Sequence, residues 1–176
     1  MKILILSTSL NAQSKSHQLA LRADALLNDA GVNTCVVDLN DLDLPMCGTA
    51  ESWNNAAAAE LTERVRESDA VLIAGPVYNY DLNAACKNAI ELTGEGWENK
   101  VVGFICTAGG PRSYMSVMPL ANSLMLDFRC VIVPRFVYVL GTSFRDGVLV
   151  DDDVERRLAE LCGEITRIAG ALRGVE

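Results

Sequence analysis

The stretch that decides the fold reads Ile3-Leu4-Ile5-Leu6 and then Ser7-Thr8-Ser9-Leu10-Asn11-Ala12-Gln13-Ser14-Lys15-Ser16-His17. Its four apolar residues form a short continuous run, which is typical of a strand buried on both faces of a parallel sheet. The small, hydroxyl-rich segment that follows leads into a helical pattern. Such a turn can hold a phosphate, because a helix N-terminus offers free backbone N–H groups and the hydroxyls add donors. An ordinary turn, with Ser14 or Ser16 as the N-cap, explains the same residues equally well.

Strand and helix patterns alternate along the rest of the chain. Further strands are expected at residues 34–39, 70–74, 101–107 and 130–140, with Gly75-Pro76 ending the third and Pro134 interrupting the fifth. Helices are expected at residues 16–30, 53–67, 82–92, 113–128 and 151–172. This alternation predicts an α/β fold, with one domain over residues 1–176. The expected architecture is a flavodoxin-like three-layer sandwich, with a five-stranded parallel sheet in the order 2-1-3-4-5.

The composition limits the classes of function. The chain carries 15 Lys and Arg against 23 Asp and Glu, a net charge of −8, which disfavours broad binding to nucleic acid or anionic membranes. No apolar run approaches the ~18 residues of a membrane span. No signal peptide is recognisable, so we expect a cytoplasmic protein whose six cysteines are free thiols. The cysteines form no Cys-x-x-Cys pair and the one histidine has no metal-type partner spacing, so no metal site is expected.

Three loops are expected to converge, because the predicted order places the carboxyl ends of strands one, three and four side by side. The first of these loops is the hydroxyl-rich segment described above. The second (residues 75–81) offers Tyr78 and Tyr80 as aromatic surface for a planar ligand. The third contains Gly109-Gly110, where a ligand can approach the backbone closely. Each loop alone is equally compatible with an ordinary turn, and their convergence favours a ligand site.

Four motifs extend this interpretation. Residues 8–16 read Thr-Ser-Leu-Asn-Ala-Gln-Ser-Lys-Ser, residues 38–45 Asp-Leu-Asn-Asp-Leu-Asp-Leu-Pro, residues 76–79 Pro-Val-Tyr-Asn, and residues 86–91 Cys-Lys-Asn-Ala-Ile-Glu. They resemble G-S-x-R-x-x-S-x-N, D-L-x-D-L-x-L-P, P-E-Y-N and L-K-N-A-I-D of the flavodoxin-like NAD(P)H-dependent FMN reductases, a family that includes quinone, azo-dye and chromate reductases. The chain departs from these motifs at four positions, where Thr8 replaces Gly, Asn11 a phosphate-binding Arg, Ser16 an Asn and Val77 a Glu.

The resemblance implies an FMN-dependent enzyme that passes hydride from NADPH or NADH through the flavin to a small-molecule acceptor by a ping-pong mechanism. The acceptor would be a quinone, an azo compound, free flavin or a metal ion. Because the flavin carries the chemistry, no catalytic side chain is required. The implied cofactor-binding residues are Ser9, Asn11, Ser14, Ser16 and His17 at the phosphate, Pro76, Val77, Tyr78 and Asn79 at the ring and ribityl chain, and Thr107, Ala108, Gly109 and Gly110 at the pyrimidine edge. Arg112 and Tyr114 are candidate contacts for the nicotinamide nucleotide or the acceptor.

Two other functions stay open. One is a flavodoxin-type electron carrier, and the other is a regulatory protein with weak or lost FMN binding. Asn11 keeps the second open, because losing an Arg–phosphate hydrogen bond costs roughly 1.5–3 kcal/mol. The expected helix at residues 113–128 is apolar on more than one face, which indicates either a homodimer or homotetramer, or deep burial within one subunit.

Overall fold

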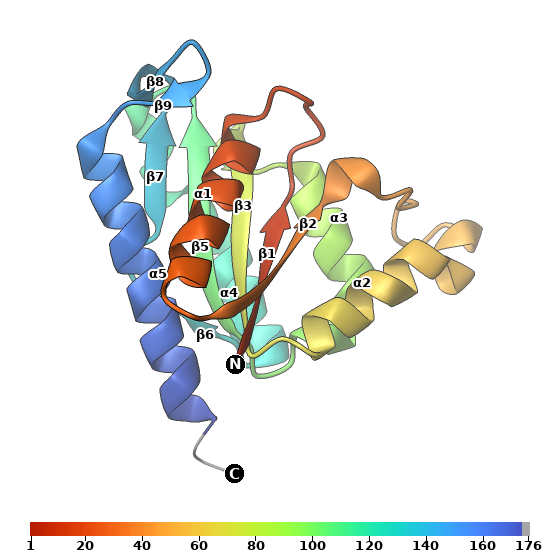
Figure 1. The fold of residues 1–176 in the computed structure, drawn as a ribbon. Helices are drawn as coiled ribbons and strands as arrows, with labels where there is room; N and C mark the ends of the chain where they lie inside the picture. Colours follow the sequence, from red (N-terminus) through yellow and green to blue (C-terminus); the bar gives the residue numbers. More distant parts are fainter. Residues whose placement is uncertain (174–176) are drawn as a thin grey trace.

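The computed structural model describes residues 1–173. A mostly parallel β-sheet forms the centre of this part of the chain (Figure 1). The sheet order is β2-β1-β3-β5-β6, and β7 also pairs with β5. The predicted order 2-1-3-4-5 is confirmed, because β5 is the expected fourth strand and β6 and β7 are two parts of the fifth. The strands of this sheet are β1 (Lys2–Ser7), β2 (Asn33–Asp38), β3 (Ala70–Tyr78), β4 (Asp81–Leu82), β5 (Val101–Ala108), β6 (Val131–Ile132) and β7 (Val137–Leu140).

The sheet has seven strands where five were expected. One additional strand arises because Pro134 and Arg135 divide the fifth, and Arg135 takes a left-handed backbone conformation (φ 67°) that interrupts the extended chain. The other is β4, which folds back antiparallel to β3. Pro134 was expected to interrupt the fifth strand, and its two parts, β6 and β7, form the edge of the sheet opposite β2, where proline is tolerated.

The prediction that Gly75-Pro76 ends the third strand was wrong. Gly75 and Pro76 stay in register with Cys106 and Thr107 of β5, and the strand continues to Tyr78. Proline is tolerated here because pairing between β1 and β3 ends at Ala74, so the missing N–H removes no ladder hydrogen bond on that side.

Helices cover both faces of the sheet (Figure 1). On one face α1 (Lys15–Asp29) and α5 (Asp152–Leu172) share a core with Ile3 and Ile5 of β1. On the other face α2 (Ala56–Arg66), α3 (Ala84–Thr93) and α4 (Met118–Phe128) pack around Leu4 and Leu6. The alternation of β1 side chains between two cores explains its unbroken apolar run.

The connections contain short helical turns and one hairpin. The 3₁₀ helices are η1 (Leu39–Asp41), η2 (Ala50–Asn54), η3 (Gly94–Trp97), η4 (Pro111–Val117) and η5 (Gly141–Ser143). The helix expected at residues 113–128 therefore begins as η4 and becomes α-helical at Met118; Ser113 within η4 has non-helical angles. The hairpin of β8 (Phe144–Arg145) and β9 (Val148–Leu149) was not predicted, although its turn, Asp146-Gly147, is a strong hairpin signal. None of the helices within residues 1–173 has the length and apolar character needed to cross a bilayer.

Candidate functional site

The loops after β1, β3 and β5 leave the sheet side by side, at the top of Figure 1. The backbone N–H of Thr8, just after β1, donates to the Ala74 carbonyl of β3 at 2.8 Å. Pro76 of β3 lies in register with Thr107 of β5. The structure thus brings together the three segments that the sequence singled out.

The first loop is held in shape largely by its own side chains. Ser14 is the N-cap of α1, and its hydroxyl accepts from the His17 N–H at 3.1 Å and lies 2.9 Å from the Ser16 hydroxyl. Ser9 accepts from the N–H of Asn11, whose side-chain oxygen in turn accepts from the Gln13 N–H at 2.9 Å. Ser9, Ser14 and Ser16 are buried while the tip of the loop is exposed. These hydroxyls therefore shape a capped turn at the start of α1, whose tip at residues 10–13 is exposed.

Lys15 does not extend over this loop. Its ammonium group lies 3.4 Å from the Gly141 carbonyl and 5.4 Å from the centre of the Phe144 ring. The positive charge of Lys15, the first residue of α1, is thus directed toward the segment after β7.

His17 joins the ends of β1 and β2. Its Nδ1 atom lies 3.0 Å from a carboxylate oxygen of Asp38 and 3.1 Å from the Ser7 hydroxyl. A Ser-His-Asp catalytic triad needs the two imidazole nitrogens to contact different partners, whereas both contacts here involve the same nitrogen. Ser7 is also fully buried. The cluster anchors α1 to the sheet and is not a nucleophilic site.

A buried polar pair connects the first loop to the second. The Thr8 hydroxyl donates to the Asn83 side-chain oxygen at 2.8 Å, and the Asn83 amide donates to the Thr8 carbonyl at 2.6 Å. The Asn83 N–H also donates to the Pro76 carbonyl at 3.1 Å. A side chain at Gly75 would collide with the Thr8 hydroxyl, so the glycine makes room for this pair. We call Thr8 and Asn83, with these hydrogen bonds, the Thr8–Asn83 latch.

The second loop is the tight turn between β3 and β4. Its two central residues, Asn79 and Tyr80, both have positive φ (50° and 70°), as in the turns that join two-residue hairpins. Such angles are unfavourable for a tyrosine. Tyr78 and Tyr80 are more than half exposed, so this hairpin displays aromatic surface.

The third loop is open at its glycines. A Cβ atom added at Gly109 or Gly110 would meet no other atom within 4 Å. The loop is held from behind by Tyr138, whose hydroxyl donates to the Gly110 carbonyl and lies 2.8 Å from the Ser113 hydroxyl. Of the two candidate substrate residues, Arg112 is exposed beside this loop, while the ring of Tyr114 packs on Phe136 at 4.7 Å. Tyr114 therefore faces the sheet edge.

The buried thiols near the site are chemically quiet. Burial raises the pKa of Cys86 to about 12, despite a hydrogen bond with Thr8 that lowers it. Within residues 1–173 no group of three or more His, Cys, Asp or Glu side chains is arranged to hold a metal ion.

The sequence of this chain matches a known family over most of its length. Residues 1–144 match the family described as NADPH-dependent FMN reductase. The chain belongs to this family. NADPH-dependent FMN reductases are oxidoreductases that use FMN as cofactor and a nicotinamide nucleotide as co-substrate, which identifies the present chain as an enzyme of this kind.

Curated relatives of this FMN reductase are distant. An NADPH:quinone oxidoreductase from Arabidopsis thaliana is 26% identical over 98% of this chain and 94% of its own length. An NAD(P)H:quinone oxidoreductase from Solanum tuberosum is 28% identical, but the match covers 64% of this chain and 62% of the potato protein.

Solved structures show the same fold. The apo NADH:FMN oxidoreductase EmoB superposes with a TM-score of 0.79 at 18% identity, covering 93% of this chain and 87% of that protein. An archaeal flavodoxin superposes with a TM-score of 0.62 at 11% identity, over 94% of this chain and 99% of its own. The predicted flavodoxin-like fold is confirmed.

Sequence reasoning missed three contributors to the site of this FMN reductase. Asp38 ends β2, whose loop was not among the three expected to converge, yet it contacts His17. Thr8 was noted as a departure from the family motif and Asn83 was not noted at all, although they form the latch. The sequence did contain a signal for this pair. Thr8 places a hydroxyl where the family motif has a glycine, and Asn83 directly precedes α3.

Proposed function

We propose that this chain reduces a quinone or an azo compound at the expense of NAD(P)H, with FMN bound across the loops after β1, β3 and β5. The observation that carries the proposal is the convergence of a serine-capped helix N-terminus, an exposed aromatic hairpin and an open diglycine loop at one end of the sheet. The quinone specificity is supported by the names of two curated relatives.

The phosphate end of FMN would lie at the N-terminus of α1. The first turn of a helix leaves backbone N–H groups without intrahelical acceptors, and the helix dipole favours an anion there. Ser14 caps one of these groups, and the loop 9–13 leads directly into this end of the helix. Ser9, Asn11, Ser14, Ser16 and His17 form this cradle, in which serines and backbone groups take the place of the family's arginine.

The ring end would lie between the hairpin and the diglycine loop. The exposed Tyr78 and Tyr80 supply apolar surface on one side, together with Pro76, Val77 and Asn79. Gly109 and Gly110 leave space for a ring edge to reach the backbone of Thr107 and Ala108. The residues present therefore fit a flat, phosphate-bearing cofactor.

FMN, when bound, supplies the hydride acceptor and donor, so the protein needs no acid, base or nucleophile of its own. The role of the protein is to orient the flavin ring, to leave one face of the ring accessible and to hold the phosphate. Arg112, exposed beside the third loop, is a candidate contact for the nicotinamide nucleotide. Tyr114 is a weaker candidate because its ring is engaged by Phe136 and Tyr138.

The test is an anaerobic titration of the FMN-loaded protein. We expect NADPH or NADH to bleach the flavin absorbance band and a subsequently added quinone to restore it. A yellow protein that stays oxidised would favour the electron-carrier alternative, and absence of FMN binding would favour a regulatory protein.

A pair of alanine variants tests where FMN binds. A side chain at Gly109 and one at Gly163 on α5 both meet no other atom within 4 Å, so Gly109→Ala and Gly163→Ala should leave the fold intact. We expect weaker FMN binding in Gly109→Ala alone, measured by quenching of flavin fluorescence. Equal affinities in the two variants would place FMN elsewhere.

We further propose that the chain forms a homodimer or homotetramer. Helices η4 and α4 expose a run of large apolar side chains, with 39–76% of each accessible: Tyr114, Met115, Met118, Met125 and Leu126. Large apolar side chains exposed on one element favour an interaction site. Light scattering at micromolar concentration should give a multiple of 19.0 kDa, and Leu126→Lys should reduce it. A monomeric mass for the unaltered chain would refute the proposal.

A further inference from the structure

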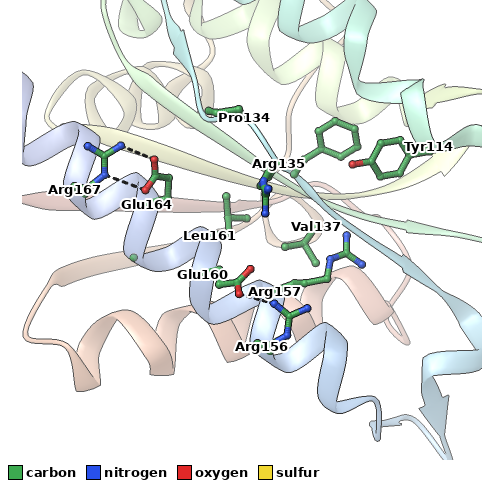
Figure 2. Close-up of a pocket in the computed structure, with 12 residues that line it drawn as sticks. Tyr114, Pro134, Arg135, Val137, Arg156, Arg157, Glu160, Leu161, Glu164 and Arg167 are labelled. Atoms are coloured by element: carbon green, nitrogen blue, oxygen red, sulfur yellow. Dashed lines mark hydrogen bonds and ion pairs between the residues drawn. The ribbon is translucent and has the colours of Figure 1, made fainter.

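A cavity of about 1050 Å³ lies away from the three loops, at the sheet edge opposite β2 (Figure 2). It opens where Pro134 and Arg135 break the fifth strand into β6 and β7, and α5 forms its other wall. The volume slightly exceeds the range of about 300–1,000 Å³ that is usual for small-molecule sites. The family motifs lie outside this cavity, and of its lining residues Tyr114 alone is also a candidate contact for the nicotinamide nucleotide.

The floor of the cavity is apolar. Val137 of β7 and Leu161 of α5 are buried there, and the rings of Tyr114 and Phe136 pack together at 4.7 Å on one side. The floor can therefore receive a hydrocarbon or aromatic body, whose burial contributes roughly 25 cal/mol per Å².

The rim of the cavity carries an excess of positive charge. Four arginines line it against two glutamates, in a chain whose net charge is −8. Arg156 is paired with Glu160 and Asp153, and Arg167 with Glu164, as the dashed lines of Figure 2 show in part.

The other two arginines are poorly neutralised. Arg157 comes no closer than 4.0 Å to Asp153, and Arg135 forms no ion pair with any residue in the described range 1–173. Figure 2 shows both side chains between α5 and the broken strand. A guanidinium group binds carboxylate, sulfonate or phosphate through paired hydrogen bonds, so two of them over an apolar floor select an anionic head on an apolar body.

The edge strand itself is unsuited to pairing with a peptide. An Nη1 atom of Arg157 lies 3.4 Å from the Tyr138 carbonyl of β7 and caps it. Pro134 has no N–H to donate, and the left-handed Arg135 departs from the extended conformation. A strand added to this edge would find few free partners, which favours a small molecule over an extended polypeptide.

We propose that this cavity is a second binding site, which takes a small anionic ligand with an apolar, planar body held between Arg135 and Arg157. The site is separate from the flavin site and does not depend on the proposed function.

The probe is 8-anilinonaphthalene-1-sulfonate, an anionic aromatic dye that becomes fluorescent in apolar surroundings, titrated into the FMN-loaded protein. Its uncharged analogue, N-phenyl-1-naphthylamine, serves as the matched ligand without the sulfonate. We expect saturable binding of the sulfonate, and we expect the double variant Arg135→Gln/Arg157→Gln to weaken it at least ten-fold while binding of the uncharged analogue stays within two-fold.

Arg66→Gln is the control variant. It removes the same charge from α2, where Arg66 is paired with Glu63 and which packs on the face of the sheet opposite to α5. It should leave dye affinity unchanged. The double variant could unfold the sheet edge at β7, because it removes the Arg157 contact with the Tyr138 carbonyl, and circular dichroism would reveal this. The single variant Arg135→Gln keeps that contact, and we expect it to weaken dye binding about three-fold.

Three results would overturn the proposal. One is equal sulfonate affinity in the parent protein and the folded arginine variants. The second is release of FMN, seen as a rise in flavin fluorescence, in step with dye binding, which would place the dye at the flavin site. The third is dye-induced protection from hydrogen exchange on α4 and not on α5, which would place the dye on the exposed apolar face.

Discussion

Replacing Thr8 by Val tests whether the Thr8–Asn83 latch holds the first two loops together. Valine keeps the shape of threonine but replaces its hydroxyl by a methyl group. The 2.8 Å hydrogen bond to Asn83 is lost, and the Asn83 side-chain oxygen is left without its donor in a region where both residues are at least 95% buried.

The expected loss follows from this burial. Leaving a buried acceptor unsatisfied costs about 1–3 kcal/mol. For a domain of this size, 1 kcal/mol corresponds to roughly 2–4 °C, so Thr8→Val should lower Tm by roughly 2–12 °C. Thr8→Ser keeps the hydroxyl and loses one buried methyl group, which costs about 0.8 kcal/mol. The serine variant should therefore be the more stable of the two.

Unfolding in urea measures the effect of the substitution on the free energy of unfolding. FMN titration measures its effect on the position of the first loop relative to the second. We expect FMN affinity to fall in Thr8→Val and to recover in Thr8→Ser, because the latch sets the phosphate loop relative to the hairpin. A double-mutant cycle with Asn83→Ala should give a coupling free energy of about 0.5–3 kcal/mol. Additive effects, or a valine variant as stable as the serine variant, would refute this account of the latch.

Three further predictions concern charge, packing and pH. Asn11→Arg should tighten FMN binding by ten-fold or more in a fluorescence titration, since it restores a charge-assisted contact worth roughly 1.5–3 kcal/mol; unchanged affinity would remove the first loop from the phosphate site. Gly103→Ala should destabilise the fold by about 1–3 kcal/mol in urea, because its Cβ would lie 2.8 Å from a methyl carbon of Leu72. Stability should fall as pH rises above about 9, because thiols ionise near 8.5 in the unfolded chain, whereas burial holds the pKa of Cys86 at about 12 in the folded protein. Thermal melts between pH 7 and 10.5 should show a smaller decrease for Cys86→Ala.

The strand order could be predicted because the first four strands each contain an apolar run and the connections between the strands fit crossover helices. The same reasoning failed at Pro76, since tolerance of a proline depends on where the neighbouring strand ends, and Ala74 is the last residue of β3 paired with β1. It also failed at the Asp146-Gly147 hairpin, where a recognisable turn signal was surrounded by strands of only two residues.

The candidate site could be predicted at the level of loops but not of contacts. Residues 7–17 are local in sequence, and their hydroxyl content already indicates a capped turn. The contacts that fix them involve Asp38 and Asn83, which lie 21 and 66 residues beyond the end of that segment. No periodicity or motif within one segment can report such a pairing, because it depends on how closely β1, β2 and β3 approach at their carboxyl ends.

These contacts also bear on how the site could work without the family's arginine. Lys15 is directed to Gly141, and the imidazole of His17 faces Asp38, so neither side chain simply replaces that charge. What the first loop has instead is rigidity: the latch at Thr8, the Asn11 turn and the Ser14 cap each fix part of it before any ligand arrives. A preformed set of donors loses less conformational entropy on binding than a mobile side chain does. We infer that this ordering offsets part of the missing charge. It follows that loss of the latch should weaken FMN binding more in the parent chain than in Asn11→Arg, where a long side chain can follow the phosphate.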